Sequence, residues 1–302
     1  MSSKAKQSQK LLLFRLSGIR LFGIGTLKIR EILPFRPLAK LPHSHQAVAG
    51  TISFRGSAVP VIDMAAAVGY PALTPEELKT SSILITDVQR QEIGFVVRGV
   101  QKIIETNWKE VKAPPKALGD KAFITGLLNV EGDTIQLMDI ELLLANVYPG
   151  SLDTQDVALT DVQSEALKAL NILLVDDSRV ARKQLCDVLD AKGISYQVTT
   201  NGDEALQVLL KDNELGQPVD ILVSDIEMPG LDGYELAFDV RDNGVLKQPY
   251  IILHTSLNSE MSLSYANQVG ANEALTKFDA EELLQAMLRA GAEKARQAVA
   301  AE

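Results

Sequence analysis

The sequence is poor in the residues that cross-link a chain or bind zinc. It has one cysteine, Cys186, in 302 residues, so no disulfide can form within the chain, which suits a reducing compartment. Its three histidines do not form a zinc-binding pattern. No apolar run approaches the roughly 18 residues of a membrane helix, and Arg15 interrupts Leu11–Phe14 too early for a secretory signal. We therefore expect a cytoplasmic protein without direct membrane insertion.

Charge is unevenly distributed along the chain. Through Gly150 there are 18 Lys and Arg residues against 13 Asp and Glu, whereas the remainder has 12 against 26. A nucleic-acid binder would need a dense basic face, so no nucleic-acid partner is expected. The acidic remainder could gather carboxylates around a metal ion or a phosphoryl group, although most of these charges must lie on solvated helix faces.

The length predicts about two domains, and the first, residues 1–150, reads as all-β. Short apolar segments alternate with turns such as Arg55-Gly56-Ser57 and Glu131-Gly132-Asp133. This rhythm favours small barrels or a sandwich over a parallel sheet. The expected strands are Leu12–Leu16, Leu21–Ile24, Thr51–Phe54, Val59–Ile62, Ile83–Asp87, Ile93–Val97, Leu127–Val130 and Thr134–Met138.

Residues 151–169 are interpreted as a linker. Ser151–Thr160 is polar and acidic with few residues suited to a core, and Asp161–Ala169 could form a short helix. Limited proteolysis is expected to cut first within Ser151–Thr160.

The second domain, residues 170–302, alternates strands and helices. Five βα units of this size indicate an open parallel sheet with helices on both faces. The expected strands are Ile172–Val175, Tyr196–Thr200, Ile221–Val223, Tyr250–Leu253 and Glu273–Thr276.

Polar side chains follow four of these five strands. Asp176 and Asp177 end the first, Asp225 the third, Thr255 the fourth and Lys277 the fifth. Ligands of such folds bind at this edge of the sheet. Gathered carboxylates repel one another unless a cation is present, and oxygen ligands suit Mg²⁺. With Lys277 and Thr255 the set could neutralise a phosphoryl group, and Asp225 is the expected nucleophile.

Taken singly, each of these residues has an ordinary structural explanation, such as a helix cap for Asp176-Asp177. Their joint occurrence is what favours a phosphoacceptor site. Val175–Ser178, Ser224–Gly233, His254–Ser256 and Lys277 together resemble the receiver domains of two-component response regulators.

That resemblance implies a flavodoxin-like fold with Asp225 as phosphoacceptor. It also implies Mg²⁺ held by Asp177, Asp225 and the carbonyl of Glu227, with Asp176 acting through water. Thr255 and Lys277 would hold the phosphoryl oxygens.

Two positions depart from the receiver pattern. Phe278 replaces the proline that usually follows the lysine, and Ala274 replaces the usual aromatic switch residue. A signal would then need another route, for which Thr255–Ser259 is the candidate.

The first domain carries no comparable chemistry and reads as a binding module. Gly50–Asp63, including Phe54, Arg55 and Gly56, resembles the central signature of CheW-type coupling domains, which consist of two SH3-like β-barrels. Two positions differ, because Ser53-Phe54 stands where the family has Asn-Leu. The resemblance implies a contact at Arg55 for a chemoreceptor tip and a histidine kinase. The alternative is an ordinary arginine in a solvated turn.

Together the two resemblances predict a chemotaxis adaptor, not an enzyme, whose receiver is phosphorylated by the histidine kinase at chemoreceptor arrays. The alternative is a phosphate sink that drains phosphoryl groups from the kinase. A transcriptional regulator is disfavoured because the other domain is β rather than helix-turn-helix. An EF-hand is disfavoured because Pro229 and Leu236 occupy two of its ligand positions.

Overall fold

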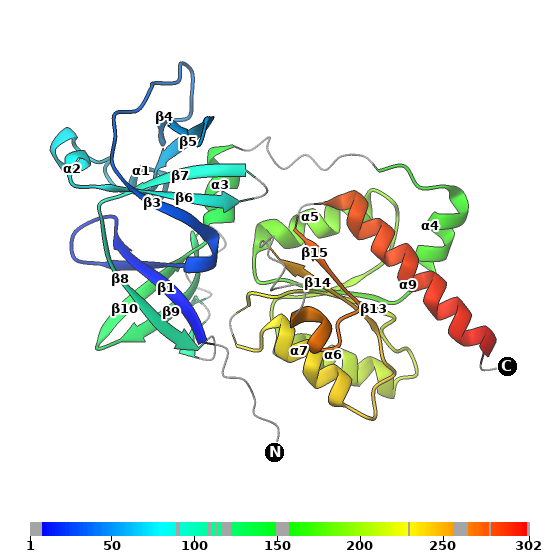
Figure 1. Ribbon diagram of the computed structural model, residues 1–302. Helices are drawn as coiled ribbons and strands as arrows, with labels where there is room; N and C mark the ends of the chain where they lie inside the picture. Colours follow the sequence, from blue (N-terminus) through cyan, green and yellow to red (C-terminus); the bar gives the residue numbers. More distant parts are fainter. Residues whose placement is uncertain are drawn as a thin grey trace. The chain divides into compact units, whose positions relative to one another are not determined.

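A computed structural model describes residues 8–88, 91–107, 110–112, 114–115, 122–148, 157–228, 230–255, 265–277 and 279–300. The chain divides into two compact units, Met1–Ser151 and Leu152–Glu302 (Figure 1). The first unit consists of two five-stranded sheets and the second of one five-stranded parallel sheet with helices, which confirms the predicted all-β and parallel α/β fold classes. Each unit is described by itself.

The first sheet of the first unit has the strand order β8-β1-β2-β10-β9. All its neighbours are antiparallel except β2 and β10, which are parallel. Its strands are β1 (Ser8–Arg15), β2 (Leu21–Gly25), β8 (Gly99–Asn107), β9 (Ile124–Val130) and β10 (Asp133–Met138).

The second sheet has the order β3-β6-β7-β5-β4, with β5 and β7 parallel. Its strands are β3 (Ile29–Pro34), β4 (Val48–Phe54), β5 (Ser57–Asp63), β6 (Ser82–Val88) and β7 (Gln91–Val97). Short helices complete the unit: η1 (Thr26–Lys28), α1 (Met64–Ala67), α2 (Pro75–Lys79) and α3 (Ile140–Val147).

The two sheets repeat one pattern. In each, an antiparallel hairpin (β4–β5 or β9–β10) turns through a left-handed non-glycine residue followed by glycine. These are Arg55 (φ 48°) with Gly56, and Glu131 (φ 54°) with Gly132. Eight residues after the first of each pair, Asp63 or Asp139 caps the following helix. This repeat is not evident from the residue types alone.

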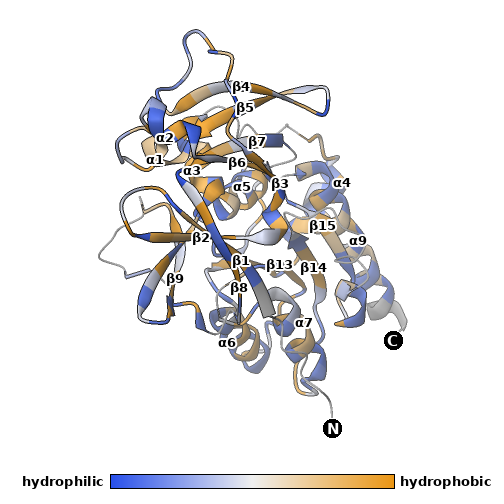
Figure 2. Cartoon of the chain, turned by 60° about the vertical axis from the view of Figure 1, so that its left-hand side comes forward, coloured by the Kyte–Doolittle hydropathy of each residue, from blue (hydrophilic) through white to orange (hydrophobic). Residues whose placement is uncertain are grey.

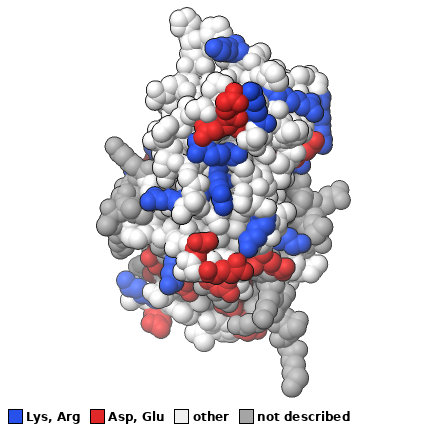
Figure 3. Space-filling view, turned by 90° about the vertical axis from the view of Figure 1, so that its left-hand side faces the viewer, with Lys and Arg blue, Asp and Glu red and all other residues white. Residues whose placement is uncertain are grey.

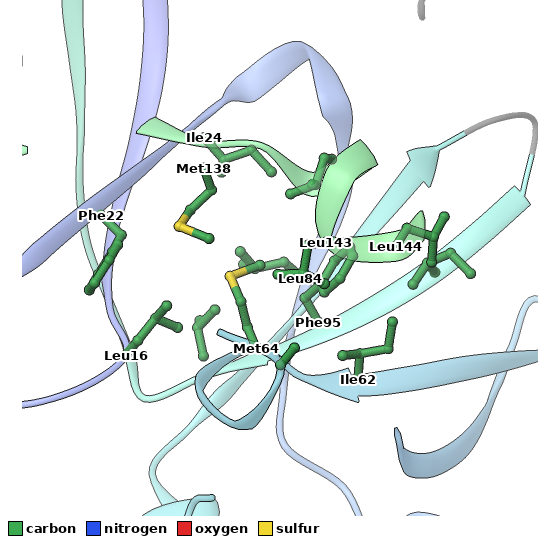
Figure 4. Packing of buried hydrophobic residues seen from close by; sticks show 14 of the residues in the cluster. Leu16, Phe22, Ile24, Ile62, Met64, Leu84, Phe95, Met138, Leu143 and Leu144 are labelled. Atoms are coloured by element: carbon green, nitrogen blue, oxygen red, sulfur yellow. The ribbon is translucent and has the colours of Figure 1, made fainter. Parts of the chain in front are cut away.

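One apolar core joins both sheets of the first unit. Phe22 and Met138 from the first sheet and Leu84 and Phe95 from the second belong to the same buried cluster, with Leu143 of α3 (Figure 4). The core is mainly aliphatic, and its burial stabilises the pair of sheets as one body.

The second unit has the strand order β12-β11-β13-β14-β15, with all neighbours parallel. Helices α5 and α9 contribute to the core on one face of the sheet and α6 and α7 to the core on the other. The elements are α4 (Asp161–Lys168), β11 (Ile172–Val175), α5 (Arg179–Asp190), β12 (Gln197–Thr199), α6 (Gly202–Glu214), β13 (Ile221–Asp225), α7 (Gly233–Asp242), β14 (Tyr250–Thr255), β15 (Glu273–Thr276) and α9 (Ala280–Ala300).

The helices of this unit are amphipathic. Figure 2 shows hydrophobic and hydrophilic residues side by side on α6 and α7, and Leu209 and Leu236 are their buried contributions to the core. Strand β11 is buried along its whole length, because a central parallel strand is covered on both faces.

Part of the expected linker belongs to the second core. Leu167 of α4 is fully buried, and Val157 and Leu159 pack against the same cluster. Helix α4 begins with a capping box formed by Thr160 and Gln163. Residues 151–156 lie outside the described residues, so the proteolytic boundary remains a prediction.

Candidate functional site

Three carboxylates meet at the carboxyl edge of the parallel sheet. Asp176 follows β11, Asp177 follows Asp176, and Asp225 ends β13. Because β11 and β13 are adjacent and in parallel register, their carboxyl ends lie side by side. One ligand oxygen from each of the three residues lies within 4.8 Å of the others.

Lys277 forms ion pairs with two of these carboxylates. Its Nζ lies 2.9 Å from Oδ2 of Asp176 and 2.8 Å from Oδ2 of Asp225. All three side chains are at most 4% exposed. The ammonium group therefore offsets the repulsion between two buried negative charges, which would otherwise be costly.

The backbone around Asp225 is held at several points. The amide of Glu227 donates to Oδ1 of Asp225 at 3.3 Å, and the amide of Ile226 donates to the carbonyl of His254 at 3.0 Å. Gly233, at the start of α7, lies so close that a Cβ there would be 2.1 Å from the Asp225 carbonyl oxygen. This close approach requires glycine at position 233, because a Cβ there would displace the Asp225 backbone.

Thr255 and His254 occupy the end of the neighbouring strand β14. Thr255 is 1% exposed, and its carbonyl accepts from the amide of Lys277 at 2.8 Å, so the two expected phosphoryl-binding residues lie together. His254 is buried, and burial together with the Lys277 charge lowers its pKa to about 3, although Asp279 opposes the shift. The imidazole is therefore neutral at physiological pH.

The other candidate site lies at the tip of the β4–β5 hairpin. Arg55 Nη2 lies 2.9 Å from Oε2 of Glu31, and the two side chains are 68% and 38% exposed. The Arg55 guanidinium also lies 5.0 Å from the centre of the Phe54 ring. Phe54 itself is 5% exposed, so it supports Arg55 from the core and does not present a free ring.

Oppositely charged side chains are interspersed on the face drawn in Figure 3. Near the tip, Arg30 pairs with Asp87 and, at 2.8 Å, with Glu92. At the equivalent tip of β9–β10, Lys102 lies 3.4 Å from Glu131. The hairpin residue of the ion pair is thus basic at the β4–β5 tip (Arg55) and acidic at the β9–β10 tip (Glu131).

Comparison with known proteins agrees with this division. Residues 10–147 match the CheW-like domain and residues 172–289 the response regulator receiver domain. The chain is 28% identical to chemotaxis protein CheV3 of Helicobacter pylori over 89% of its length and 90% of that protein.

The chain is of the CheV type. It is also 25% identical to CheV2 of the same organism, covering 91% of this chain and 92% of that one. Among solved structures, the scaffolding protein CheW of Thermoanaerobacter tengcongensis is 23% identical, with a TM-score of 0.42, over 47% of this chain and 92% of that one. In this CheV-type chain the CheW-like domain comes first and the receiver second.

The donor set of the receiver fits a magnesium ion. The three carboxylates lie within reach of a common point, and hard oxygen ligands in a partly closed site suit Mg²⁺. The acidic cluster is typical of such a site. Glu227 is half-buried beside Asp225, from which its backbone carbonyl could contribute a further oxygen.

The structure brings together Asp176, Asp177, Asp225, Thr255 and Lys277, as the strand-end argument expects. It also places Arg182 beside them, which the sequence analysis did not single out. In the sequence, Arg182 could have been noticed only as a basic residue one turn into the helix that follows Asp176-Asp177. Residues 256–264 and Phe278 lie outside the described residues, so the switch route through Thr255–Ser259 stays a prediction.

Among the described residues, no helix is long and apolar enough to span a membrane.

Proposed function

We propose that this CheV-type chain is an adaptor that couples chemoreceptors to the histidine kinase, and that phosphorylation of Asp225 regulates the coupling. The observation that carries the proposal is the buried arrangement of Asp176, Asp225 and Lys277 in a chain that also has a CheW-like domain. The CheW-like domain would supply the scaffold, and the receiver domain would regulate it.

In the proposed transfer, a carboxylate oxygen of Asp225 forms a bond to phosphorus while the P–N bond to the donor phosphohistidine breaks. The donor imidazole leaves and takes up a proton. Asp177, Asp225 and the carbonyl of Glu227 would hold Mg²⁺, with Asp176 acting through water. When bound, the ion would offset charge on the equatorial phosphoryl oxygens.

Lys277 and Thr255 supply the remaining stabilisation. The Lys277 ammonium already touches Asp225 and can follow the phosphoryl group with its flexible side chain. The Thr255 hydroxyl can donate to a phosphoryl oxygen. Phosphorylation adds about −1.5 to −2 charges at pH 7. The added charge on Asp225 would change how strongly the Lys277 ammonium is attracted to Asp225 relative to Asp176.

The receptor and kinase would be contacted through the β4–β5 tip, with Arg55 at its exposed end and Phe54 and Gly56 shaping the turn. Arg55 is held by Glu31 and by the Phe54 ring, so the guanidinium is presented in a defined position. The location that follows from this role is the cytoplasm, at chemoreceptor arrays on the inner face of the membrane.

A reconstituted receptor–kinase assay tests the proposal. Wild type, Asp225→Asn and Arg55→Glu are compared with and without a phosphoryl donor, with Arg36→Glu as an exposed charge-reversal control. We expect Arg55→Glu to lose recruitment and Asp225→Asn to retain recruitment but lose the response to the donor. A chain that only drains phosphoryl groups would leave coupling unaffected by either variant, which would contradict the adaptor role.

A further inference from the structure

Arg182 lies one turn into α5, and its side chain contacts the loop that carries Asp176 and Asp177. Its Nη1 atom donates to the Asp176 carbonyl at 2.7 Å and to the Asp177 carbonyl at 2.8 Å. A single guanidinium nitrogen therefore binds two consecutive peptide carbonyls. The two residues whose backbone it holds are the acidic residues that follow β11.

Ser178, the next residue of the chain, also fixes this loop. The Ser178 amide donates to Oδ1 of Asp176 at 2.8 Å, and its hydroxyl accepts from the Ala181 amide at 3.4 Å to cap α5. The amide of Arg182 in turn donates to the Ser178 carbonyl at 2.9 Å. Helix α5 and the loop thus form one hydrogen-bonded unit that includes the Arg182 side chain.

Lys277 and Arg182 contact different kinds of oxygen atom near the site. Lys277 contacts carboxylate oxygens of Asp176 and Asp225. Arg182 contacts carbonyl oxygens and, in the part of the chain that the structure describes, shares no ion pair with the carboxylates. It adds positive charge close to the site without occupying the oxygens that a metal ion would use.

We propose that Arg182 is a positioning residue for the cation site: it orients the Asp176-Asp177 backbone so that both carboxyl groups face Asp225. This inference rests on the proposed binding of Mg²⁺ at these residues. Groups that orient metal ligands from behind contribute strongly to binding, and their loss lowers metal affinity by about 10- to 100-fold. The planar guanidinium suits two neighbouring acceptors, whereas a lysine ammonium offers a point charge on a flexible chain.

The test is a magnesium titration of the full chain, followed by the amide resonances of Asp177, Ser178 and Glu227 and by calorimetry. Arg182→Gln removes the charge and the paired hydrogen bonds, and Arg182→Lys keeps the charge alone. Lys183→Gln is the matched control, because it removes one charge from the next position of α5, where Lys183 is exposed and pairs with Asp187. Urea unfolding without magnesium shows separately what each variant does to stability.

We expect Arg182→Gln to raise the magnesium dissociation constant at least tenfold, Arg182→Lys severalfold, and Lys183→Gln less than twofold. Equal changes in Arg182→Gln and Lys183→Gln would reduce the effect to general charge and overturn the proposal, as would unchanged affinity in both Arg182 variants. If Arg182→Gln fails to fold, Arg182→Lys decides by the same criterion. Failure of the wild type to bind magnesium would instead refute the metal site of the proposed function, and the Arg182 role with it.

Discussion

The two candidate sites place charged groups in opposite environments. At the receiver edge, Lys277, Asp176 and Asp225 are at most 4% exposed, whereas Arg55 and Glu31 at the β4–β5 tip are 68% and 38% exposed. Both are ion pairs with separations near 2.9 Å. Distance alone therefore does not tell the two sites apart, and burial does.

Burial decides what each ion pair can contribute. An exposed pair is worth about 0–1 kcal/mol and weakens with salt. Removing one partner of a buried pair leaves an uncompensated charge and costs about 3–5 kcal/mol. At the buried receiver edge, additional negative charge must therefore be neutralised by a cation. At the exposed β4–β5 tip, the charged side chains are accessible to a binding partner.

The largest effect is expected for Lys277→Met in magnesium-free buffer. The second unit should lose about 3–5 kcal/mol of unfolding free energy, because Asp176 and Asp225 lose their shared cation. Arg55→Met should cost about 1 kcal/mol or less. Hydrogen exchange in β11 and β13, and separately in β4 and β5, measures both. Similar losses in the two variants would remove the contrast between the sites.

The next largest effect is expected for Gly233→Ala, which should lower the unfolding free energy by about 3 kcal/mol, at the upper end of the usual cost of overpacking. A Cβ there would lie 2.1 Å from the Asp225 carbonyl oxygen, so the Asp225 backbone must shift and acetyl phosphate labelling should fall. Gly244→Ala is the control, because no heavy atom lies within 4 Å of its added Cβ. Equal labelling of both variants would show that the Asp225 backbone tolerates displacement.

Acid should destabilise the second unit through His254. Its pKa is lowered to about 3 in the folded chain by burial and Lys277, with Asp279 acting in the opposite direction. The unfolded chain, with a pKa near 6.5, therefore binds a proton first, and stability falls as the pH drops from 6.5 toward 3.

The expected His254 contribution is about 2 kcal/mol lost by pH 5, at about 1.4 kcal/mol per unit of pH. His254→Leu should lose correspondingly less between pH 7 and pH 5. Parallel stability curves for the wild type and the variant in urea unfolding would show that the imidazole is not buried in its neutral form.

The smallest effect on stability is expected at the tip. Exchanging the charges in Arg55→Glu with Glu31→Arg should change the unfolding free energy by less than about 1 kcal/mol, while each single variant weakens partner recruitment. The doubly substituted chain preserves the pair but inverts its polarity. Full recruitment of that chain would mean that Arg55 acts only through Glu31 and not through a partner.

The receiver site could be predicted from the sequence because a parallel sheet brings strand ends together. Strands Ile172–Val175 and Glu273–Thr276 have the predicted bounds, so the residues after them fall at one edge. Arg182 could not be predicted in the same way. Its partners are backbone carbonyls, so the one sign in the sequence is a basic residue one turn into the helix that follows Asp176-Asp177.

The strands and strand pairing of the first unit were harder to predict from the sequence. Strands β3 and β8 were missed. The parallel pairs β2–β10 and β5–β7 join segments far apart in the chain, which local alternation cannot reveal. The repeat of the two sheets survives only in the turn geometry and in the capping residues Asp63 and Asp139. The burial of Phe54 depends on packing against residues of other strands.

Direct labelling tests whether Asp225 accepts a phosphoryl group with the help of Mg²⁺. The full chain is incubated with acetyl phosphate with and without magnesium, and the added mass is located by mass spectrometry. Asp225→Asn is compared with Asp187→Asn, which changes an exposed carboxylate of α5. We expect magnesium-dependent label on the wild type and on Asp187→Asn, and none on Asp225→Asn. Undiminished labelling of Asp225→Asn, or labelling of the wild type that is unaffected by magnesium, would contradict this role of Asp225.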